Sequence, residues 1–352
     1  MQEVVHFYLP WHRDGVDRLP VRPEDYWSWI VPRRNIGEGK YSWTLQTFLY
    51  LREAGVPCVL AETFPSHGIV ISHRDFLPVI LPSNADVFLV CIKPDRKEHT
   101  WAQHYMVQNE HDPAFVLFSP ACVSQMKFWP QPSLRPRDPS RGARCENVGY
   151  FGRMINLAPE LRDPRWHQEL EDVGFRWLTP NMEHWNDYRS IDVTVSVRAF
   201  GLKRNATDAV FDPNSKPPAK LTNSWLAGVP SIVGNESSYT SIKSSALDFI
   251  GVDSKDALKQ ALIGLRDDRI LYERMQAHGQ RRAMEFSAEA VVERWQDVLA
   301  TSIRPASTAW MRLPRWRRNL RNVGRFAKYF SRSRNIADII VTIAGKVSKP
   351  TQ

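Results

Sequence analysis

The sequence has few cysteines and no long apolar run, and both shortages limit what the chain can be. Only four of its 352 residues are cysteine, at Cys58, Cys91, Cys122 and Cys145. Their wide spacing matches no zinc site and favours reduced, mostly buried thiols in a cytosolic protein. No segment is long and apolar enough to span a bilayer, and residues 1–14 lack the basic and apolar regions of a signal peptide.

Two other absences concern metals and repeats. No Asp-x-Asp pair, which would mark a metal-dependent nucleotide site, occurs in the chain. No sequence repeat of the kind that builds a solenoid occurs either. We therefore expect an ordinary globular protein of two domains, which 352 residues can form, and no metal cofactor.

Positive charge is present in excess, but only at one end of the chain. The net charge is +9, and residues 305–352 contain eleven Arg and Lys against the single Asp338, a local charge of +10. The remaining 304 residues therefore carry about −1. A protein that reads nucleic acid would be expected to spread its charge over the binding face, so we expect no nucleic-acid partner.

The first half alternates apolar strands and helices. Strand-like runs are predicted at 4–9, 57–61, 68–75, 85–92 and 102–112, and a helix at 41–54 ends at Gly55. Such alternation is typical of a mostly parallel sheet. Ligands of these sheets gather at the carboxyl ends of the strands, which here are residues 73–75, 93–96 and 108–112.

A proline-rich segment divides the chain. Residues 129–142 contain four prolines and no periodicity, so they predict a hinge. Strands at 147–152, 192–198 and 248–252 follow, with helices at 159–173, 255–266, 267–284 and 288–300, the last capped by Ser287. We expect an N-terminal domain at 1–128, a second domain at 143–286, a helix at 287–303 and a basic tail at 304–352.

The most informative stretch is "KPPAKLTNSWLAGVPSIVG", residues 216–234. Pro217 and Pro218 suit the first turn of a helix and Gly228 suits its end, and a buried strand follows. The N-terminus of such a helix can bind an anion. Lys216 and Lys220 stand at this entrance, while Arg153 and Arg198 end two strands of the same half. Each lysine alone would be a solvated surface charge, but the four cations together could clamp a diphosphate without a metal.

This pattern resembles the donor-binding half of GT-B glycosyltransferases, and most of all the large retaining group of bacterial mannosyl- and rhamnosyltransferases of polysaccharide assembly. "HYMVQNE" and "VGYFGR" are similar to strand ends of that group. The resemblance implies an α/β fold of two Rossmann-like domains that face a cleft. It implies acceptor binding by residues 1–128, nucleotide-sugar binding by residues 143–286, and a return of helix 288–300 to the first domain.

The resemblance also assigns individual residues. Gly37 and Gly39 match the family's glycine loop, which places Lys40 and Tyr41 toward the cleft, although a tight turn before a helix explains the two glycines equally well. Asn223 stands where related enzymes usually carry a glutamate that accepts hydrogen bonds from the donor ribose. It keeps an acceptor oxygen but has no charge.

An inverting enzyme would need a general base, whereas a retaining enzyme of this group needs none. His73, Asp75 and Glu110 are the candidate catalytic residues, because they follow strands of the first half.

The basic tail has an apolar stripe at helical spacing, formed by Trp310, Leu313, Trp316, Leu320, Val323, Phe326 and Phe330. Arginines including Arg315 and Arg318 lie on other faces. Tryptophan and arginine on an amphipathic helix are typical of an interfacial membrane anchor. A helix packed on the protein's own core is the alternative.

Taken together, these patterns predict a metal-independent, retaining glycosyltransferase that transfers a sugar from a nucleotide sugar to a glycan or lipid-linked acceptor in surface polysaccharide synthesis. It would lie on the cytoplasmic face of the plasma membrane and bind anionic lipid through its tail. The alternative is a non-catalytic sugar-nucleotide-binding or assembly subunit on the same scaffold. The sugar, the nucleotide, the acceptor and the oligomeric state do not follow from the sequence.

Overall fold

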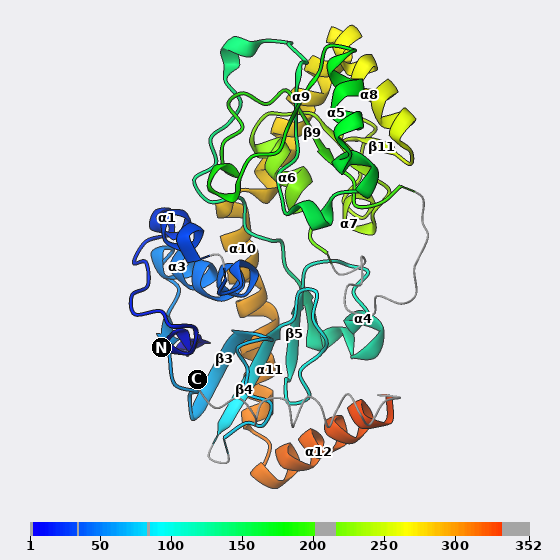
Figure 1. The fold of residues 1–352 in the computed structure, drawn as a ribbon. Coiled ribbons are helices and arrows are strands. Elements are labelled where there is room, and N and C mark those ends of the chain that lie inside the picture. The colour runs from blue at the N-terminus through cyan, green and yellow to red at the C-terminus, as the bar shows by residue number, and fades with distance from the viewer. Residues whose placement is uncertain (1–2, 34, 83–84, 201–215, 333–352) are drawn as a thin grey trace, which may run out of the picture.

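The computed structural model describes residues 3–33, 35–82, 85–200 and 216–332, with side chains as far as Arg325. Two α/β domains are stacked along the long axis of the molecule, and a long helical segment runs from the second domain along the first (Figure 1). Each domain has a parallel sheet. The expected α/β fold of two facing domains with a helical C-terminal region is therefore confirmed.

The sheet of the N-terminal domain is parallel and has the order β2-β1-β3-β4-β5-β6. Its strands are β1 (Val5–Tyr8), β2 (Cys58–Ala61), β3 (His67–His73), β4 (Asp86–Ile92), β5 (His104–Val107) and β6 (Val123–Gln125). The central strands β3 and β4 are apolar along most of their length and buried, as expected for a parallel sheet that is covered on both faces.

The helices of this domain are short. They are α1 (Tyr26–Ile30), α2 (Glu38–Tyr41), α3 (Thr47–Glu53) and α4 (Ala114–Leu117), and a π-helical turn at Ser42–Gln46 joins α2 to α3. The helix predicted at 41–54 is thus present, and it begins three residues earlier. Phe48, Leu49 and Leu51 place its apolar face in the core of the domain.

The sheet of the C-terminal domain is also parallel, with the order β11-β10-β9-β7-β8. Its strands are β7 (Asn147–Gly149), β8 (Arg176–Leu178), β9 (Val193–Ser196), β10 (Ser231–Gly234) and β11 (Ile250–Val252). The helices are α5 (Pro164–Glu171), α6 (Ala219–Leu226), α7 (Ser237–Thr240), α8 (Lys255–Asp267) and α9 (Arg269–Ala283).

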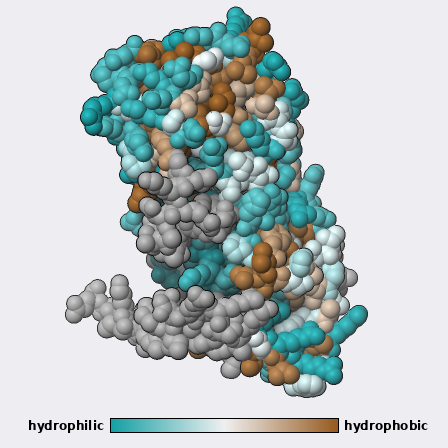
Figure 2. Space-filling model, turned by 90° about the vertical axis from the view of Figure 1, so that its right-hand side faces the viewer, coloured by the Kyte–Doolittle hydropathy of each residue, from teal (hydrophilic) through white to brown (hydrophobic). Residues whose placement is uncertain are grey.

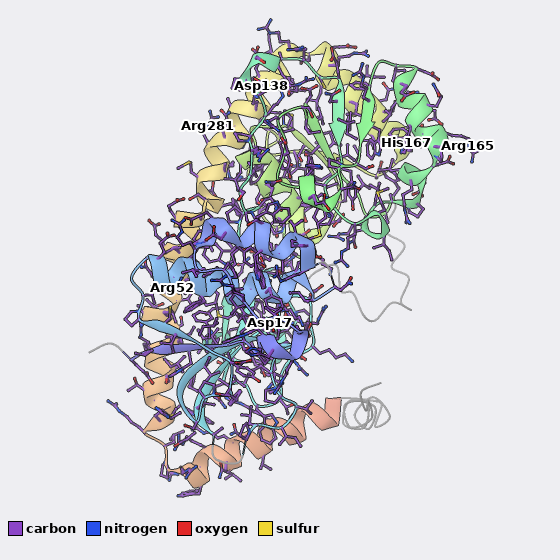
Figure 3. All side chains as sticks on the ribbon, turned by 60° about the vertical axis from the view of Figure 1, so that its left-hand side comes forward. Asp17, Arg52, Asp138, Arg165, His167 and Arg281 are labelled. Atoms are coloured by element: carbon purple, nitrogen blue, oxygen red, sulfur yellow. The ribbon has the colours of Figure 1, made fainter. Side chains whose placement is uncertain are left out.

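The proline-rich segment is anchored at both ends. Trp129 is buried in the N-terminal core, where its Nε1 donates to Thr47 Oγ1 at 2.8 Å. Arg137 and Arg141 bind the buried carboxylate of Asp192 in the C-terminal domain at 2.8 and 2.7 Å. Asp138 lies at the end of that domain that points away from the N-terminal domain (Figure 3). The part free to act as a hinge is therefore shorter than residues 129–142.

The chain returns to the N-terminal domain through α10 (Ala288–Val298), a π-helical turn at Leu299–Ile303 and α11 (Arg304–Met311). Ser287 caps α10, because its Oγ accepts a hydrogen bond from the amide of Ala290 at 3.2 Å. Trp295 is buried against Phe7 of β1. Figure 3 shows this helical segment running beside the first sheet, so the two domains are joined at two places.

The last helix of the chain is α12 (Arg315–Arg332), and it does not continue α11. The two helices are separated at Arg312–Pro314, and α12 runs across the end of the N-terminal domain that lies far from the C-terminal domain (Figure 1). Trp310, expected at a membrane, is buried in the N-terminal core with 6% of its surface exposed. That assignment was wrong for Trp310, because α11 uses the apolar stripe for internal packing. It was also wrong for Arg318, whose side chain is buried and pairs with Asp86 of β4.

Candidate active site

The carboxyl ends of the strands in the two sheets meet at the junction of the domains. Arg153, after β7, donates to Glu38 of the N-terminal domain at 2.9 Å. Lys216, before α6, pairs with Asp95, which follows β4. Asn109, after β5, donates from its Nδ2 to the carbonyl oxygen of Lys216 at 3.3 Å. These contacts place the polar strand ends of both domains in one site.

Lys220 lies at the centre of the cationic residues. It is on the first turn of α6, and its Nζ lies over the ring of Tyr150 at 5.5 Å. Its side chain passes so close to Gly152 that a Cβ at that position would lie 2.8 Å from Lys220 Cε. Among the residues that the structure describes, no carboxylate lies within ion-pair distance of Lys220.

The surroundings of Lys220 disfavour its charge. Burial is the main cause that lowers its pKa to about 7, and the positive charges of Arg198 and Lys216 act in the same direction. Glu236 opposes them by raising the pKa. A negatively charged ligand would raise this pKa and favour the protonated lysine, so the site is electrostatically suited to an anion.

The other cations are held by carboxylates. Arg198 follows β9 and binds Glu236 Oε2 from its Nε at 2.7 Å, while its Nη1 donates to Asn156 Oδ1 at 3.1 Å. Burial alone would raise the pKa of Asp95, but the hydrogen bond and the charge of Lys216 outweigh it and lower the pKa. The arrangement therefore fixes the positions of Arg198 and Lys216.

The glycine loop and the helix after it form the opposite wall. Gly37 has a φ of 86° and precedes α2, so it adopts a backbone conformation that favours glycine. Asp14 accepts hydrogen bonds from Lys40 Nζ at 2.7 Å and Tyr41 Oη at 2.8 Å. Lys40 also lies over the ring of Phe76 at 4.8 Å, close to the end of β3. Asp14 thus holds both Lys40 and Tyr41 in place. Tyr41 is fully buried in the core of the N-terminal domain, so the expectation that it faces the cleft was wrong.

His73 is the last residue of β3 and is buried. Its Nδ1 accepts a hydrogen bond from the amide of Asp75 at 3.1 Å, and burial is the main cause that lowers its pKa to about 4. The ring is therefore neutral, and the proton is on Nε2 because Nδ1 is an acceptor. In this geometry His73 is a hydrogen-bond donor, which disfavours a role as general base.

Asp75 and Glu110, the other two candidates for acid–base chemistry, lie apart from each other. Asp75 pairs with Arg96 at 3.0 Å. Glu110 is exposed and lines a cavity of about 380 Å³ between the domains, together with Thr222 and Phe286. This cavity lies against a different face of α6 from that of Lys220. Among the described residues, no ion pair or hydrogen bond joins Glu110 to His73 or Asp75.

Asn223 contacts the hinge. Its Oδ1 accepts a hydrogen bond from the amide of Gln131 at 3.0 Å, in the short free part of the proline-rich segment. A contact between Asn223 and a donor ribose stays a prediction. The observed bond indicates that this side chain also links α6 to the segment about which the domains would move.

Four carboxylates of this site were not singled out from the sequence, namely Asp14, Glu38, Asp95 and Glu236. Asp95 and Glu236 follow strand ends within three residues, and that position is a signal that could have identified them. Asp14 ends a short 3-10 helix and Glu38 begins α2, and neither position carries such a signal. Within residues 3–33, 35–82, 85–200 and 216–332, no group of three or more His, Cys, Asp or Glu side chains could hold a metal ion.

Comparison of the sequence with family models and with curated proteins gave no match. Among solved structures, HepE of Anabaena in complex with UDP and glucose is 11% identical, with a TM-score of 0.49, 85% of this chain and all of HepE being covered. TarM of S. aureus is 8% identical, with a TM-score of 0.48 over 73% of this chain and 59% of TarM. AviGT4, a glycosyltransferase of avilamycin A biosynthesis, is 10% identical, with a TM-score of 0.44 over 85% and 99% of the two chains.

This chain therefore spans less than two thirds of the TarM structures, 58% and 59% of their lengths. The strand order provides the architecture directly: two parallel sheets, with their carboxyl ends facing each other, are joined by a hinge and by a helix that returns to the first domain. This chain has the architecture of the GT-B fold.

Proposed function

We propose that this protein is a glycosyltransferase that transfers a sugar from a nucleotide sugar to a glycan or lipid-linked acceptor in surface polysaccharide synthesis. The observation that carries the proposal is the set of cations at the junction of the domains, with Lys220 at its centre. Lys220 is held in a site where its pKa is about 7, and Arg198 and Lys216 are near enough to contribute to that shift. Arg153 follows Gly152, which is in contact with the Lys220 side chain.

The chemistry of the leaving group explains this composition. Breaking the bond between the anomeric carbon and the donor phosphate leaves a nucleoside diphosphate, and its negative charge grows in the transition state. Fixed cations directed at that charge lower the barrier most in a site with little water. Arg198 is pre-positioned by Glu236 and Asn156, so little reorganisation would be needed when charge develops.

The proposal includes transfer with retention and without a metal. The geometry of His73 supports the first part, because an N–H donor can bind a hydroxyl of the sugar but cannot accept the acceptor's proton. The four cations support the second part, because they would supply the positive charge that a metal provides elsewhere. Asn223 is proposed to contact the donor ribose.

The proposal also includes binding to a membrane surface. Helix α12 contains seven Arg or Lys and no acidic residue, and Trp316, Leu320 and Val323 on it are exposed. Among the described helices, none is long and apolar enough to cross a bilayer. We infer that α12 binds an anionic membrane surface, which would place the enzyme as a peripheral protein on the cytoplasmic face of the plasma membrane. The side chain of Phe326 lies outside the described residues.

The test uses a panel of UDP-, GDP- and dTDP-sugars in a thermal-shift assay, followed by product analysis with the donor that binds. A ligand at a hundredfold its Kd should stabilise the protein by about 2.7 kcal/mol. Lys220→Ala should then lower kcat at saturating donor by roughly tenfold or more. Lys255→Ala is the matched control, because Lys255 forms a surface pair with Glu169 on the outer side of the domain.

The outcomes separate the alternatives. Turnover that is lost in Lys220→Ala and kept in Lys255→Ala supports the proposal. Binding of a nucleotide sugar without transfer or hydrolysis would favour the non-catalytic subunit instead. If no donor on the panel binds, the proposed function is contradicted.

A further inference from the structure

Helix α12 is attached to the body of the protein by its polar face. Arg318 donates from Nη2 to Asp86 Oδ2 at 3.1 Å, and Asn322 Oδ1 accepts from Gln103 Nε2 at 3.1 Å. One turn further on, Arg325 lies over the ring of Trp310 at 5.4 Å. Positions 318, 322 and 325 lie on one side of a helix with 3.6 residues per turn, and this side faces the N-terminal domain.

The opposite face of α12 is apolar and points away from the protein. Trp316, Leu320 and Val323 are 62%, 65% and 58% exposed, and their positions lie about half a turn from those of the polar side. An amphipathic helix in a globular protein usually buries its apolar side and exposes its charges. In α12 the orientation is reversed: the polar side contacts the N-terminal domain, and the apolar side is left open to an external partner.

The charge of the helix identifies that partner as an anionic surface. Arg315, Arg317 and Arg321 are exposed beside the apolar side, and α12 contains no acidic residue. Exposed tryptophan and leucine flanked by arginine suit the boundary between headgroups and acyl chains, in which such helices are buried by about 5–10 Å. Figure 2, which views the molecule from another side, shows hydrophilic and hydrophobic residues intermixed over the described surface of both domains.

The length of strand β4 gives the distance between α12 and the candidate site. Its first residue, Asp86, binds Arg318 of α12. Three residues after its other end, Asp95 binds Lys216 of the cationic cluster. Seven residues of strand at roughly 3.3 Å each give a separation of about 20–25 Å. The helix contacts the amino ends of the strands, whereas the site is at their carboxyl ends.

From this geometry we infer that α12 holds the protein upright on an anionic bilayer, and that the acceptor is the distal end of an extended lipid-linked glycan. The second part rests on the proposed function. The polar headgroup layer on each side of a bilayer is only about 5–7 Å thick, so a sugar attached directly to a lipid headgroup does not extend over the length of β4. A chain of several sugars, projecting from the lipid along the side of the N-terminal domain, does.

The orientation is tested without any substrate. Full-length protein is bound to a supported bilayer of phosphatidylglycerol and phosphatidylcholine, and neutron reflectometry gives its density profile along the membrane normal. Two successive layers, with the C-terminal domain in the outer one, are expected. A single thin layer, with both domains against the lipid, would overturn the inference. So would an unchanged profile for a variant with Trp316→Ser, Leu320→Ser and Val323→Ser, because that variant should leave the bilayer.

The acceptor class is tested with one acceptor sugar presented in three ways: free in solution, coupled directly to a phospholipid, and coupled through a poly(ethylene glycol) spacer that exceeds the length of β4. Transfer to the spacer-linked form in vesicles should exceed transfer to the directly coupled form by roughly a hundredfold, because a tether that cannot span two sites gives an effective concentration near zero. Equal rates for the two would overturn the inference and leave the proposed function intact. No transfer to any of the three, the free form included, would instead contradict the proposed function.

Discussion

The residue that governs the site is Lys220. Its half-buried side chain lies between α6 and the loop after β7, near two other cations, and its Nζ lies over the face of Tyr150. Among the described residues it has no carboxylate partner, unlike Arg198 and Lys216, which pair with Glu236 and Asp95. A cation in this position costs free energy until an anion arrives, so ligand binding and protonation at Lys220 should be linked.

Because of Lys220, we expect the protein to take up a proton when the proposed donor binds. With a pKa of about 7 in the free protein, Lys220 is mostly neutral at pH 8, and a bound diphosphate raises its pKa again. Binding is therefore strongest below pH 7 and weakens as pH rises above 7, with uptake close to one proton at pH 8. Calorimetry in buffers of different ionisation enthalpy measures this number directly.

Lys220→Arg provides the control for proton uptake, because a guanidinium stays charged at any pH used. This variant should bind the nucleoside diphosphate with almost no proton uptake and with a flat pH profile over the same range. If it takes up as many protons as the wild type, the titrating group is another residue, and the account of Lys220 is incorrect.

At the scale of elements, the informative comparison is between α11 and α12. The two helices contain one continuous stripe of apolar residues in the sequence, but Pro314 cannot donate the hydrogen bond that would continue α11. The chain therefore changes direction, and α12 begins one residue later. As a result Trp310 packs in the core, whereas Trp316 on the next helix is 62% exposed.

Substitution of the two tryptophans should have different effects, one on stability and the other on membrane binding. Trp310→Ala should lower the free energy of unfolding by about 3–5 kcal/mol, because it leaves a cavity in the N-terminal core. Trp316→Ala should change that free energy by no more than about 0.5 kcal/mol, yet it should weaken sedimentation with phosphatidylglycerol vesicles at every salt concentration, because apolar contacts are not screened.

Urea unfolding and vesicle sedimentation of the same two preparations check both effects. Binding of the wild-type protein should weaken steeply as salt is raised, because each arginine near the lipid contributes about 1 kcal/mol through its charge. Equal sedimentation of wild type and Trp316→Ala at all salt concentrations would mean that α12 binds another partner. An unchanged unfolding curve for Trp310→Ala would contradict the packing of α11.

At the scale of the whole molecule, ion pairs between the domains compete with the proposed ligand. Arg153 pairs with Glu38, and Lys216 pairs with Asp95. Both cations belong to the proposed diphosphate site, and both carboxylates belong to the N-terminal domain. A diphosphate would replace these carboxylates as the partner of each cation, so the two pairs resist binding in the structure described here.

Removing the competing charge should therefore strengthen binding. Glu38→Gln and Asp95→Asn are each expected to lower the Kd of the nucleoside diphosphate by about two- to fivefold, in line with about 0.4–1 kcal/mol for an ion pair that is partly exposed. Asp187→Asn is the control, because Asp187 pairs with Arg189 at 2.6 Å outside the site. Titration calorimetry gives the three values, and weaker binding in the first two variants would mean that these carboxylates contact the ligand themselves.

Much of the fold could be predicted from local pattern. The helices at 255–266, 267–284 and 288–300 appear as α8, α9 and α10 within a few residues, because apolar residues at helical spacing and caps such as Ser287 act over single turns. The strands β6 and β8 were not predicted, because their three-residue segments, VSQ and RWL, include polar residues and do not form an apolar run. Strand ends also indicated where Arg198 and His73 would lie, because parallel strands place their carboxyl ends at one edge.

What the sequence by itself determined was the alternation of strands and helices, the concentration of positive charge in the tail and the cations at the entrance of α6. The tertiary structure decided which charges meet: Glu38 with Arg153, Asp95 with Lys216, and Asp86 with Arg318. It also decided that Trp310 is buried and Trp316 exposed. An apolar stripe specifies that a helix has two faces, but the face that turns inward depends on the neighbouring surface. Here the amino end of β4 carries the carboxylate of Asp86, which pairs with Arg318 on the polar face of α12.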